Sequence, residues 1–387
     1  MGIQQIDKEY VSGTYNRFPV TVVSGKGSLV RDEKGREYID LGSGIAVNSF
    51  GVADEVWQKA VTEQLGRVQH MSNLYYTEPC AKLAEQLCRR TGMRKVFFSN
   101  SGAEANECAI KAARKWAAEA KGPGYSTIVT LKNSFHGRTL TTLAATGQDH
   151  YHELFQPLTP GFVHTTVGDI EDLKRIFATY KVAGVLIECI QGEGGVLPLD
   201  AGYARALEAV VRENNAVLMV DEVQTGNGRT GMLYGYMNFG IKPDVVSTAK
   251  GLGGGLPLGA TLLGERVQNV FGYGDHGSTF GGNPVCCAGA LSILARIDDA
   301  LMQGVREKGE FVKKSLAGAP GVQSVVGMGL MLGIKTDKPA GDVVRACMER
   351  GVLCLTAKDK VRLLPALNIP MELLQKAVAV IKEVCAA

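Results

Sequence analysis

One lysine of the sequence stands where an amine could act as a nucleophile. Lys250 follows the apolar run "DVVSTA" directly and is itself followed by the glycine-rich stretch "GLGGG". Desolvation at the end of a buried strand disfavours the ammonium form of a lysine, and the neutral amine can then form a Schiff base with a carbonyl. We expect the glycines to let a flat cofactor lie against the backbone. The alternative is a solvated surface lysine beside a flexible loop.

Two further groups at predicted strand ends supply complementary chemistry. Asp221 ends the apolar run "AVLMV", where a carboxylate needs a cationic ligand or serves as a structural hydrogen-bond acceptor. The stretch Ser101, Gly102 and Ala103 opens a long helical pattern, so unpaired N–H groups and the positive end of the helix dipole are available to a phosphate. Ser101 could equally be an ordinary helix N-cap.

An amine nucleophile, a buried carboxylate and an anion site are the three groups that pyridoxal phosphate requires. The amine forms the Schiff base, the carboxylate pairs with the pyridine nitrogen, and the helix N-terminus holds the phosphate. Their occurrence together indicates this cofactor far more strongly than any one of them does alone.

Short apolar runs bounded by turn residues predict the elements that position these groups. The runs are almost entirely apolar, as strands buried on both faces are. Helical patterns at 103–120 and 200–215 lie between several of them, which predicts an α/β fold with a mostly parallel sheet. Ligands bind at the carboxyl ends of the strands in such sheets. The predicted strands are 95–100, 126–131, 183–190, 216–223, 244–249 and 259–264.

The alternation of predicted strands and helices ends at about residue 284. A long helical pattern over 284–317, then short strands and a final helix from residue 371, predict a second, smaller α+β domain. A hairpin with its turn at Lys34 and Gly35 is expected to join that domain. The expected division is an N-terminal segment, 1–50, that contributes to the small domain, a large cofactor-binding domain, 51–284, and a C-terminal small domain, 285–387.

Composition and charge exclude several classes of function. The net charge is +3 without any block of lysine or arginine, so we expect neither nucleic acid nor a membrane surface as a partner. No targeting signal or membrane-spanning stretch occurs, and the nine cysteines form no C-x-x-C pair, which favours a cytoplasmic protein. No metal site is expected, because His136, His150, His152 and His164 lack metal-ligand spacing. They are interpreted as a turn residue and surface groups.

Two other classes of protein are alternatives to a pyridoxal-phosphate enzyme. The stretch from Gly226 to Gly231 satisfies G-x-G-x-x-G, which is a dinucleotide-binding fingerprint when a helix begins at the glycines. The following residues show no helical period, so a loop is expected and a dehydrogenase is disfavoured. A binding protein that has lost catalysis would have lost the lysine, the aspartate or the phosphate site, and all three are present.

Six motifs occur in this order along the chain: "NSGAEANECAIKAAR", "SFHGRT", "ECIQGEGGV", "DEVQTGNGRTG", "STAKGLGGGLPLGA" and "HGSTFGGNP". With these motifs the sequence resembles the class III pyridoxal-phosphate aminotransferases of fold type I over nearly its whole length. Within that class it is most similar to the enzymes of arginine biosynthesis that transfer the distal amine of N-acetylornithine to 2-oxoglutarate, and the resemblance implies this activity. The alternative is another class III ω-aminotransferase, acting on succinylornithine, succinyl-diaminopimelate, ornithine or 4-aminobutyrate.

The resemblance implies the cofactor contacts. Lys250 would form the Schiff base and carry the proton to and from the substrate carbon, and Asp221 would keep the pyridine nitrogen protonated. Phe135 would stack on the ring, and Gln224 would bind its phenolic oxygen. The phosphate would be held by Ser101, Gly102, Ala103 and Thr279 of the partner subunit. A homodimer with shared active sites is therefore expected.

The resemblance also implies the substrate contacts. Arg138 would bind the carboxylate at the far end of the substrate, and Arg362 the α-carboxylate of glutamate, since a guanidinium pairs with a carboxylate through two hydrogen bonds. Glu193 would cover Arg362 when the donor has no carboxylate next to its reacting carbon. The alternative for either arginine is a surface or interface ion pair. Further substrate contacts are placed at Tyr15, Asn73 and Ser278, although a tyrosine there could equally line the dimer interface.

Overall fold

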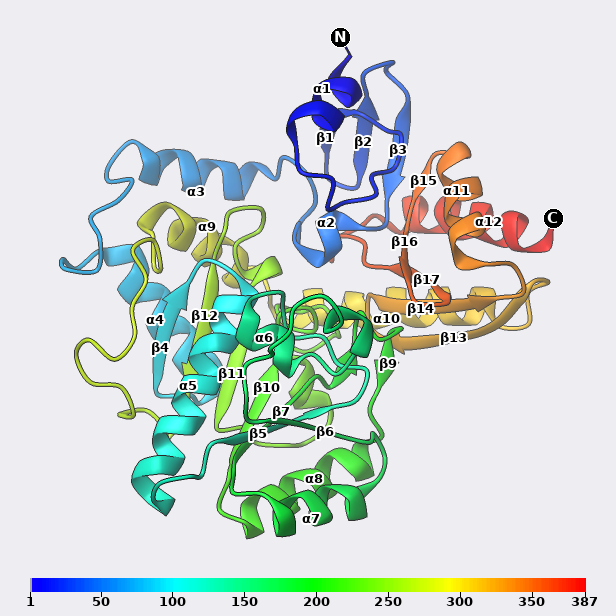
Figure 1. The fold of residues 1–387 in the computed structure, drawn as a ribbon. Coiled ribbons are helices and arrows are strands. Elements are labelled where there is room, and N and C mark those ends of the chain that lie inside the picture. The colour runs from blue at the N-terminus through cyan, green and yellow to red at the C-terminus, as the bar shows by residue number, and fades with distance from the viewer. Residues whose placement is uncertain (1) are drawn as a thin grey trace.

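The structure is a computed structural model that describes residues 2–387 (Figure 1). In this range a seven-stranded sheet forms the centre of the larger part of the molecule. Its strands pair in parallel except at β12, which is antiparallel to both neighbours, so the predicted α/β fold with a mostly parallel sheet is confirmed. The strand order is β4 (Lys95–Ser99), β12 (Gly259–Leu263), β11 (Val245–Thr248), β10 (Val217–Asp221), β7 (Val182–Ile187), β5 (Thr127–Leu131) and β6 (Phe162–Thr165).

The strands are apolar almost throughout because helices cover both faces of the sheet. Along β10, Val217 and Met219 belong to the cluster that includes the alanines of α5 (Gly102–Lys121). Leu218 and Val220 belong to the opposite cluster, which α7 (Ile170–Thr179) and α8 (Ala201–Glu213) close. Successive side chains of a strand point to opposite faces, so a strand covered on both sides must be apolar at every position.

Two four-stranded sheets among the described residues form the smaller part. β2 and β3 make the predicted hairpin, with Gly35 at a φ of +80° in its turn. β3 also pairs in parallel with β15, where Ile39 lies opposite Val352, so N-terminal and C-terminal segments share a sheet. The strands are β1 (Val22–Lys26), β2 (Leu29–Asp32), β3 (Glu37–Asp40) and β15 (Val352–Leu353) in one sheet, and β13 (Val322–Met328), β14 (Met331–Thr336), β17 (Lys360–Leu363) and β16 (Leu355–Ala357) in the other.

The predicted helical pattern over 284–317 is two helices, α9 (Pro284–Leu294) and α10 (Asp299–Leu316). Asp298 caps the second helix by accepting a hydrogen bond from the Leu301 N–H at 2.8 Å. Buried residues of α9 belong to the core cluster of the larger part, whereas α10 contributes Val305 and Val312 to the cluster of the smaller part. The expected division into domains stays a prediction, but α9 packs with the larger part.

The remaining helices complete the surface. No helix within residues 2–387 is long and apolar enough to cross a membrane. These helices are α1 (Ile3–Tyr10), α2 (Ser43–Ala46), α3 (Glu55–Leu65), α4 (Glu78–Thr91), α6 (Leu140–Ala145), α11 (Ala340–Glu349) and α12 (Met371–Ala386).

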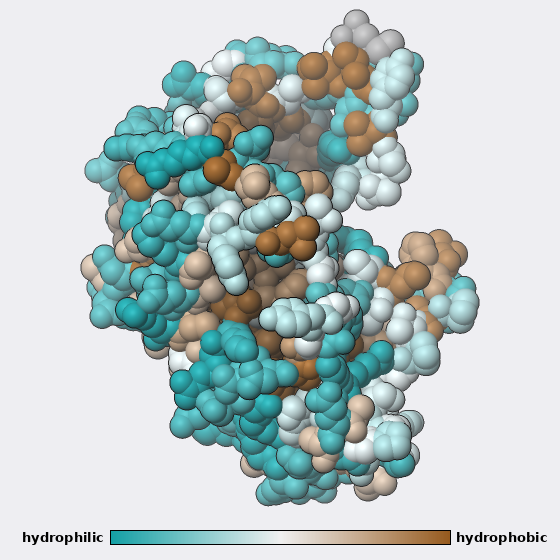
Figure 2. All heavy atoms as spheres, turned by 90° about the vertical axis from the view of Figure 1, so that its left-hand side faces the viewer, coloured by the Kyte–Doolittle hydropathy of each residue, from teal (hydrophilic) through white to brown (hydrophobic). Residues whose placement is uncertain are grey.

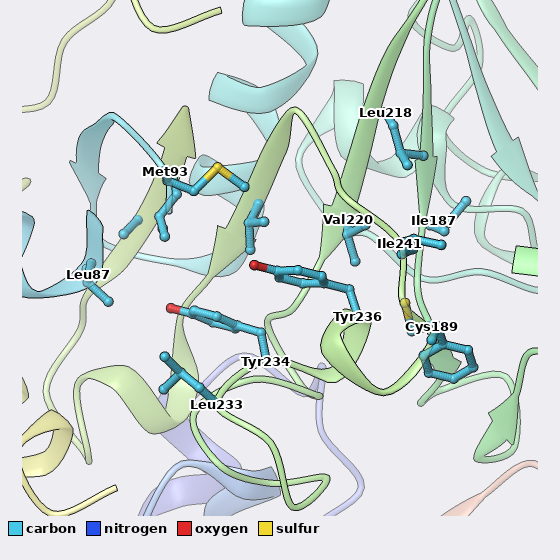
Figure 3. Packing of buried hydrophobic residues seen from close by; sticks show 14 of the residues in the cluster. Leu87, Met93, Ile187, Cys189, Leu218, Val220, Leu233, Tyr234, Tyr236 and Ile241 are labelled. Atoms are coloured by element: carbon cyan, nitrogen blue, oxygen red, sulfur yellow. The ribbon is translucent and has the colours of Figure 1, made fainter. Parts of the chain in front are cut away.

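A buried carboxylate orders the loop that contains the G-x-G-x-x-G match. Glu222 follows β10 and accepts hydrogen bonds from the backbone N–H groups of Gly235 and Tyr236, at 2.7 and 2.6 Å, and from the Thr225 hydroxyl at 2.6 Å. No helix begins at these glycines, as predicted. Beyond the loop, the rings of Tyr234 and Tyr236 lie almost parallel, with centroids 6.2 Å apart, beside Val220 in the core (Figure 3).

The burial of Glu222 predicts a pH dependence of stability. Burial raises its pKa to about 7, although its three hydrogen-bond donors oppose the shift. From the ordinary pKa up to about pH 7, the folded chain holds a proton that the unfolded chain releases, so stability falls as pH rises through this window. In Glu222→Gln, which cannot titrate, this loss should shrink by roughly 2 kcal/mol. Urea titrations at pH 5.5 and 7.5 measure the difference, and equal losses in both proteins would contradict it.

Candidate active site

Lys250 lies at the carboxyl end of β11, where it begins the short helix η3 (Lys250–Leu252). β10 and β11 are parallel neighbours with Asp221 opposite Ser247, so Lys250 and Asp221 emerge at the same edge of the sheet. Burial lowers the pKa of the Lys250 amine, while the charges of Glu193 and Asp221 oppose the shift. A lowered pKa increases the share of the neutral, nucleophilic amine at pH 7.

The glycines after Lys250 pack the loop against its neighbours more than they receive a ligand. A side chain at Gly254 would meet Ile293 at 2.3 Å and the Trp57 ring at 3.1 Å. Within the described residues, only Gly255 of the glycine run lines the pocket next to Lys250. The expectation that a cofactor lies along this run is therefore corrected, because Trp57 and Ile293 occupy the space.

Asp221 is a buried carboxylate with donors on both oxygens. Its Oδ2 accepts a hydrogen bond from Asn106 Nδ2 at 2.7 Å and lies 2.9 Å from His136 Nδ1, and its Oδ1 accepts one from the Val223 N–H at 3.0 Å. No lysine or arginine among residues 2–387 forms an ion pair with Asp221. A buried carboxylate without such a partner suits a cationic ligand, such as a protonated pyridine.

The N-terminus of α5 offers unused hydrogen-bond donors. Ser101 caps the helix by accepting a hydrogen bond from the Glu104 N–H at 3.2 Å. The N–H groups of Gly102 and Ala103 have no acceptor in the part of the chain that the structure describes. A side chain at Gly102 would meet the Val223 side chain at 2.6 Å, so this position requires glycine. The helix tip can therefore receive an anion.

A pocket of about 520 Å³ connects the amine, the carboxylate and the helix tip. This volume is in the range of sites for cofactors and small molecules. One set of residues thus supplies an anion cradle, an amine and a buried negative charge around a single cavity, and these groups fit pyridoxal phosphate. The predicted site residues that line the pocket are Ser101, Gly102, Ala103, Phe135, Arg138, Glu193, Asp221, Gln224 and Lys250.

Arg362 is buried on β17 and is covered by Glu193. Its Nη1 donates to Glu193 Oε1 at 2.5 Å and to Gln224 Oε1 at 3.2 Å, and Gln224 Nε2 donates to Glu193 at 3.2 Å. Burial opposes the ionisation of Glu193, but the charge and the hydrogen bond of Arg362 lower its pKa overall. Arg362 Nε has no partner in the described chain. The guanidinium therefore keeps unused capacity for a carboxylate.

Arg138 is an exposed guanidinium held by aromatic rings. Its Cζ lies 5.1 Å from the centre of the Phe135 ring and 6.0 Å from that of Tyr151, and these two rings meet edge to face at 5.6 Å. No carboxylate among the described residues pairs with Arg138, in contrast to Arg362. Arg138 is therefore free to bind an acidic group that enters the pocket.

Arg362 contacts the pocket residues Glu193 and Gln224 but does not itself line the pocket, and four other predicted site residues also lie outside it. Ser278 and Thr279 line a second cavity, of about 430 Å³, together with Asn73, which donates to the carbonyls of Ser278 and Gly281 at 2.8 and 2.9 Å. Tyr15 is 67% exposed and stacks on Arg17. Their assignment to the active site stays a prediction that depends on a second copy of the chain.

Three buried residues of the pocket were not predicted as functional. His136 is fully buried against Asp221, which corrects its interpretation as a turn residue. Glu188 accepts the N–H of Phe135 at 2.8 Å, and burial raises its pKa to about 7. The signal for Glu188 is a carboxylate inside an otherwise apolar run. Asn106 gave no signal, because a single amide on a helix is not unusual.

The strand-end lysine and aspartate, together with the anion-accepting helix tip, define a pyridoxal-phosphate-dependent transferase of fold type I. The family described as Aminotransferase class-III matches residues 10–385. The chain belongs to this family, whose members are pyridoxal-phosphate-dependent transaminases, and it is an enzyme of that kind.

Similar proteins support this assignment. The chain is 47% identical to an acetylornithine aminotransferase of Haemophilus ducreyi, over 99% of this chain and 98% of the relative. Among solved structures, it superposes on the ornithine aminotransferase of Toxoplasma gondii with a TM-score of 0.94 at 31% identity, covering 99% of this chain and 94% of that one. The N-acetylornithine aminotransferase of Stenotrophomonas maltophilia gives a TM-score of 0.86 at 33% identity, and the match covers 99% of this chain and 98% of that one.

The pairing of Glu193 with Arg362 predicts rescue by an added carboxylate. Glu193→Ala leaves the buried guanidinium without its anion and should lower the free energy of unfolding by about 1–3 kcal/mol. Because Arg362 is then free, 2-oxoglutarate should raise the melting temperature of the variant more than that of the wild type. Glu193→Gln, which keeps an acceptor without the charge, should lie between the two. A variant that gains no more than the wild type would contradict the pairing.

Proposed function

We propose that the protein transfers the distal amino group of N-acetylornithine to 2-oxoglutarate, yielding the semialdehyde and glutamate. The observation that carries the proposal is the single pocket that holds Lys250, Asp221 and the free N–H groups of α5. The names of the relatives support N-acetylornithine as the amino donor, since eight curated relatives at 40–47% identity are called acetylornithine aminotransferases. The ornithine aminotransferase structures are less similar than these relatives, at 28–31% identity.

The two arginines account for two substrates in one site. N-acetylornithine carries its carboxylate far from the reacting amine, so Arg138 binds that group while Glu193 stays on Arg362. Glutamate carries a second carboxylate on its reacting carbon, and this group displaces Glu193 from Arg362. The exposed, ring-packed arginine therefore serves both substrates, and the covered arginine serves glutamate alone.

Lys250 and Asp221 perform the chemistry with the cofactor. Bound pyridoxal phosphate supplies an electron sink for the reacting carbon. Lys250 would hold the cofactor through its Nζ, and the same Nζ would remove the proton from the reacting carbon of the substrate and later return one. The Asp221 carboxylate would keep the pyridine nitrogen protonated, and the N–H groups of Gly102 and Ala103 would hold the phosphate.

Steady-state kinetics with a panel of donors tests the proposal. With 2-oxoglutarate as acceptor, we expect kcat/KM to be highest for N-acetylornithine, and lower for succinylornithine, ornithine and 4-aminobutyrate. Lys250→Ala should lose activity by a factor of 10³ or more, since no other lysine among the described residues lines the pocket. Borohydride treatment should fix the cofactor to residue 250 in the wild type alone. A higher kcat/KM for ornithine or 4-aminobutyrate would favour another ω-aminotransferase.

We propose further that two copies of the chain share their active sites. The connection between α3 and α4 and the loop before α9 present large exposed apolar side chains on one side of the molecule. Figure 2 views that side, where brown, hydrophobic atoms lie around a recess. Patches of this kind mark protein interfaces. The residues are Leu65, Val68, Met71, Leu74, Tyr75, Tyr76, Tyr273 and Phe280. Thr279 in the same loop would then reach the phosphate of the partner's cofactor.

A charge in this patch should dissociate the dimer. Leu74→Asp combined with Tyr76→Asp should lower the mass measured by light scattering to that of one chain, because charged groups are depleted at interface cores. Cofactor affinity should fall with it, since Thr279 would no longer contribute. Tyr180→Asp, at an exposed aromatic residue that follows α7, is the matched control and should stay dimeric. Retention of the dimer by the double variant would contradict the proposed interface.

The state of the cysteines supports a cytoplasmic location. All nine cysteines are free in the described residues, and most are buried. Free thiols persist in reducing compartments, where disulfides are rare. We therefore propose the cytoplasm, with small-molecule substrates and a second copy of the chain as the partners.

A further inference from the structure

Asn106 uses all three hydrogen-bonding groups of its side chain inside the protein. The residue lies one turn into α5 and is 1% exposed. Its Nδ2 donates to Asp221 Oδ2 at 2.7 Å and to the carbonyl of His136 at 2.8 Å, and its Oδ1 accepts from the Ser247 hydroxyl at 2.5 Å. Two donors and one acceptor fix the orientation of the amide without ambiguity.

These bonds tie together segments that are distant in the sequence. Asp221 ends β10, Ser247 is on the neighbouring β11, and His136 belongs to the loop between β5 and α6. Asn106 itself is on the helix whose first turn, at Gly102 and Ala103, offers the anion site. One side chain therefore connects the end of the pocket that receives the phosphate to the carboxylate that meets the pyridine nitrogen.

The Asp221 carboxylate has few other constraints. His136 is the second side chain at Oδ2, and its own Nε2 is buried without a partner. A neutral imidazole with its proton on Nδ1 is the form that leaves no buried N–H unpaired. Without Asn106, Oδ2 would keep only the hydrogen bond from His136 and Oδ1 only that from the Val223 N–H. The carboxylate would then be held less firmly about its χ2 angle, which is a broad torsion in aspartate.

We propose that Asn106 is a positioning residue that orients Asp221 toward the pyridine nitrogen and sets its distance from the anion site on the same helix. The inference rests on the proposed cofactor chemistry of Asp221. It assigns to Asn106 a role at one atom of the cofactor, the ring nitrogen, rather than in general packing. The residue acts through Asp221 and does not itself take part in proton transfer.

A cofactor analogue isolates this role. In the carbocyclic analogue of pyridoxal phosphate, a C–H group replaces the ring nitrogen, so Asp221 cannot pair with it, while the phosphate and aldehyde are unchanged. Equilibrium dissociation constants of both compounds are measured with the full chain freed of cofactor. The wild type should prefer pyridoxal phosphate. Asn106→Leu, which keeps the side-chain volume, should weaken pyridoxal phosphate by about 10-fold and the analogue by less than about 2-fold.

Two further variants separate the possible explanations. Ser247→Ala removes a hydrogen bond of the same buried amide but leaves both N–H donors in place, so it should lower the melting temperature and keep the preference for pyridoxal phosphate. Asp221→Ala should abolish the preference. Equal weakening of both compounds by Asn106→Leu would mean a packing role and would overturn the inference.

The outcomes also distinguish this inference from the proposed function. If Asp221→Ala keeps the preference, the assignment of Asp221 to the ring nitrogen fails, and the inference fails with it. If Asp221→Ala loses the preference and Asn106→Leu retains it, only the inference about Asn106 is overturned. Should Asn106→Leu not fold, Asn106→Ala is measured instead, with the same expected loss of preference.

Discussion

The active site depends on the parallel pairing of β10 and β11. In that register Asp221 lies opposite Ser247, and the chain after each strand turns away at the same edge of the sheet. A buried carboxylate and an amine are thereby held at fixed positions without forming an ion pair with each other. Each charge would be costly in this environment unless a ligand compensated it. The fold thus places two buried ionisable groups at one edge of the sheet, and the cofactor supplies the groups that compensate them.

The same demand explains the other charged groups around the pocket. Glu193 pairs with the buried Arg362, whereas Arg138 has no carboxylate partner among the described residues and packs on Phe135. One arginine of the site thus has an anionic partner within the chain, and the other has none among the described residues. In the proposed function this difference would give two modes of substrate binding.

Much of the site was predictable because chemistry and strand pattern coincide in the sequence. A lysine and an aspartate that follow apolar runs are visible without coordinates, since a strand buried on both faces must be apolar and any polar residue at its end stands out. Asn106, His136 and the packing of the glycine run against Trp57 were not predictable, because they depend on contacts between segments far apart in the chain. The break between α9 and α10 was hidden by a helical pattern that continues across it. Tyr15, Asn73, Ser278 and Thr279 are outside the pocket of the single chain, so their roles need a second copy.

The pairing of β3 with β15 has a consequence for how the protein is made. Ile39 leaves the ribosome early, but its partner Val352 is synthesised roughly 300 residues later, which at about 5–20 residues per second is about 15–60 s. During that interval the N-terminal hairpin has one edge without its neighbour, and an open edge can pair with other chains. Nascent protein is therefore most exposed to aggregation at its N-terminus, where a chaperone would have the longest time to act.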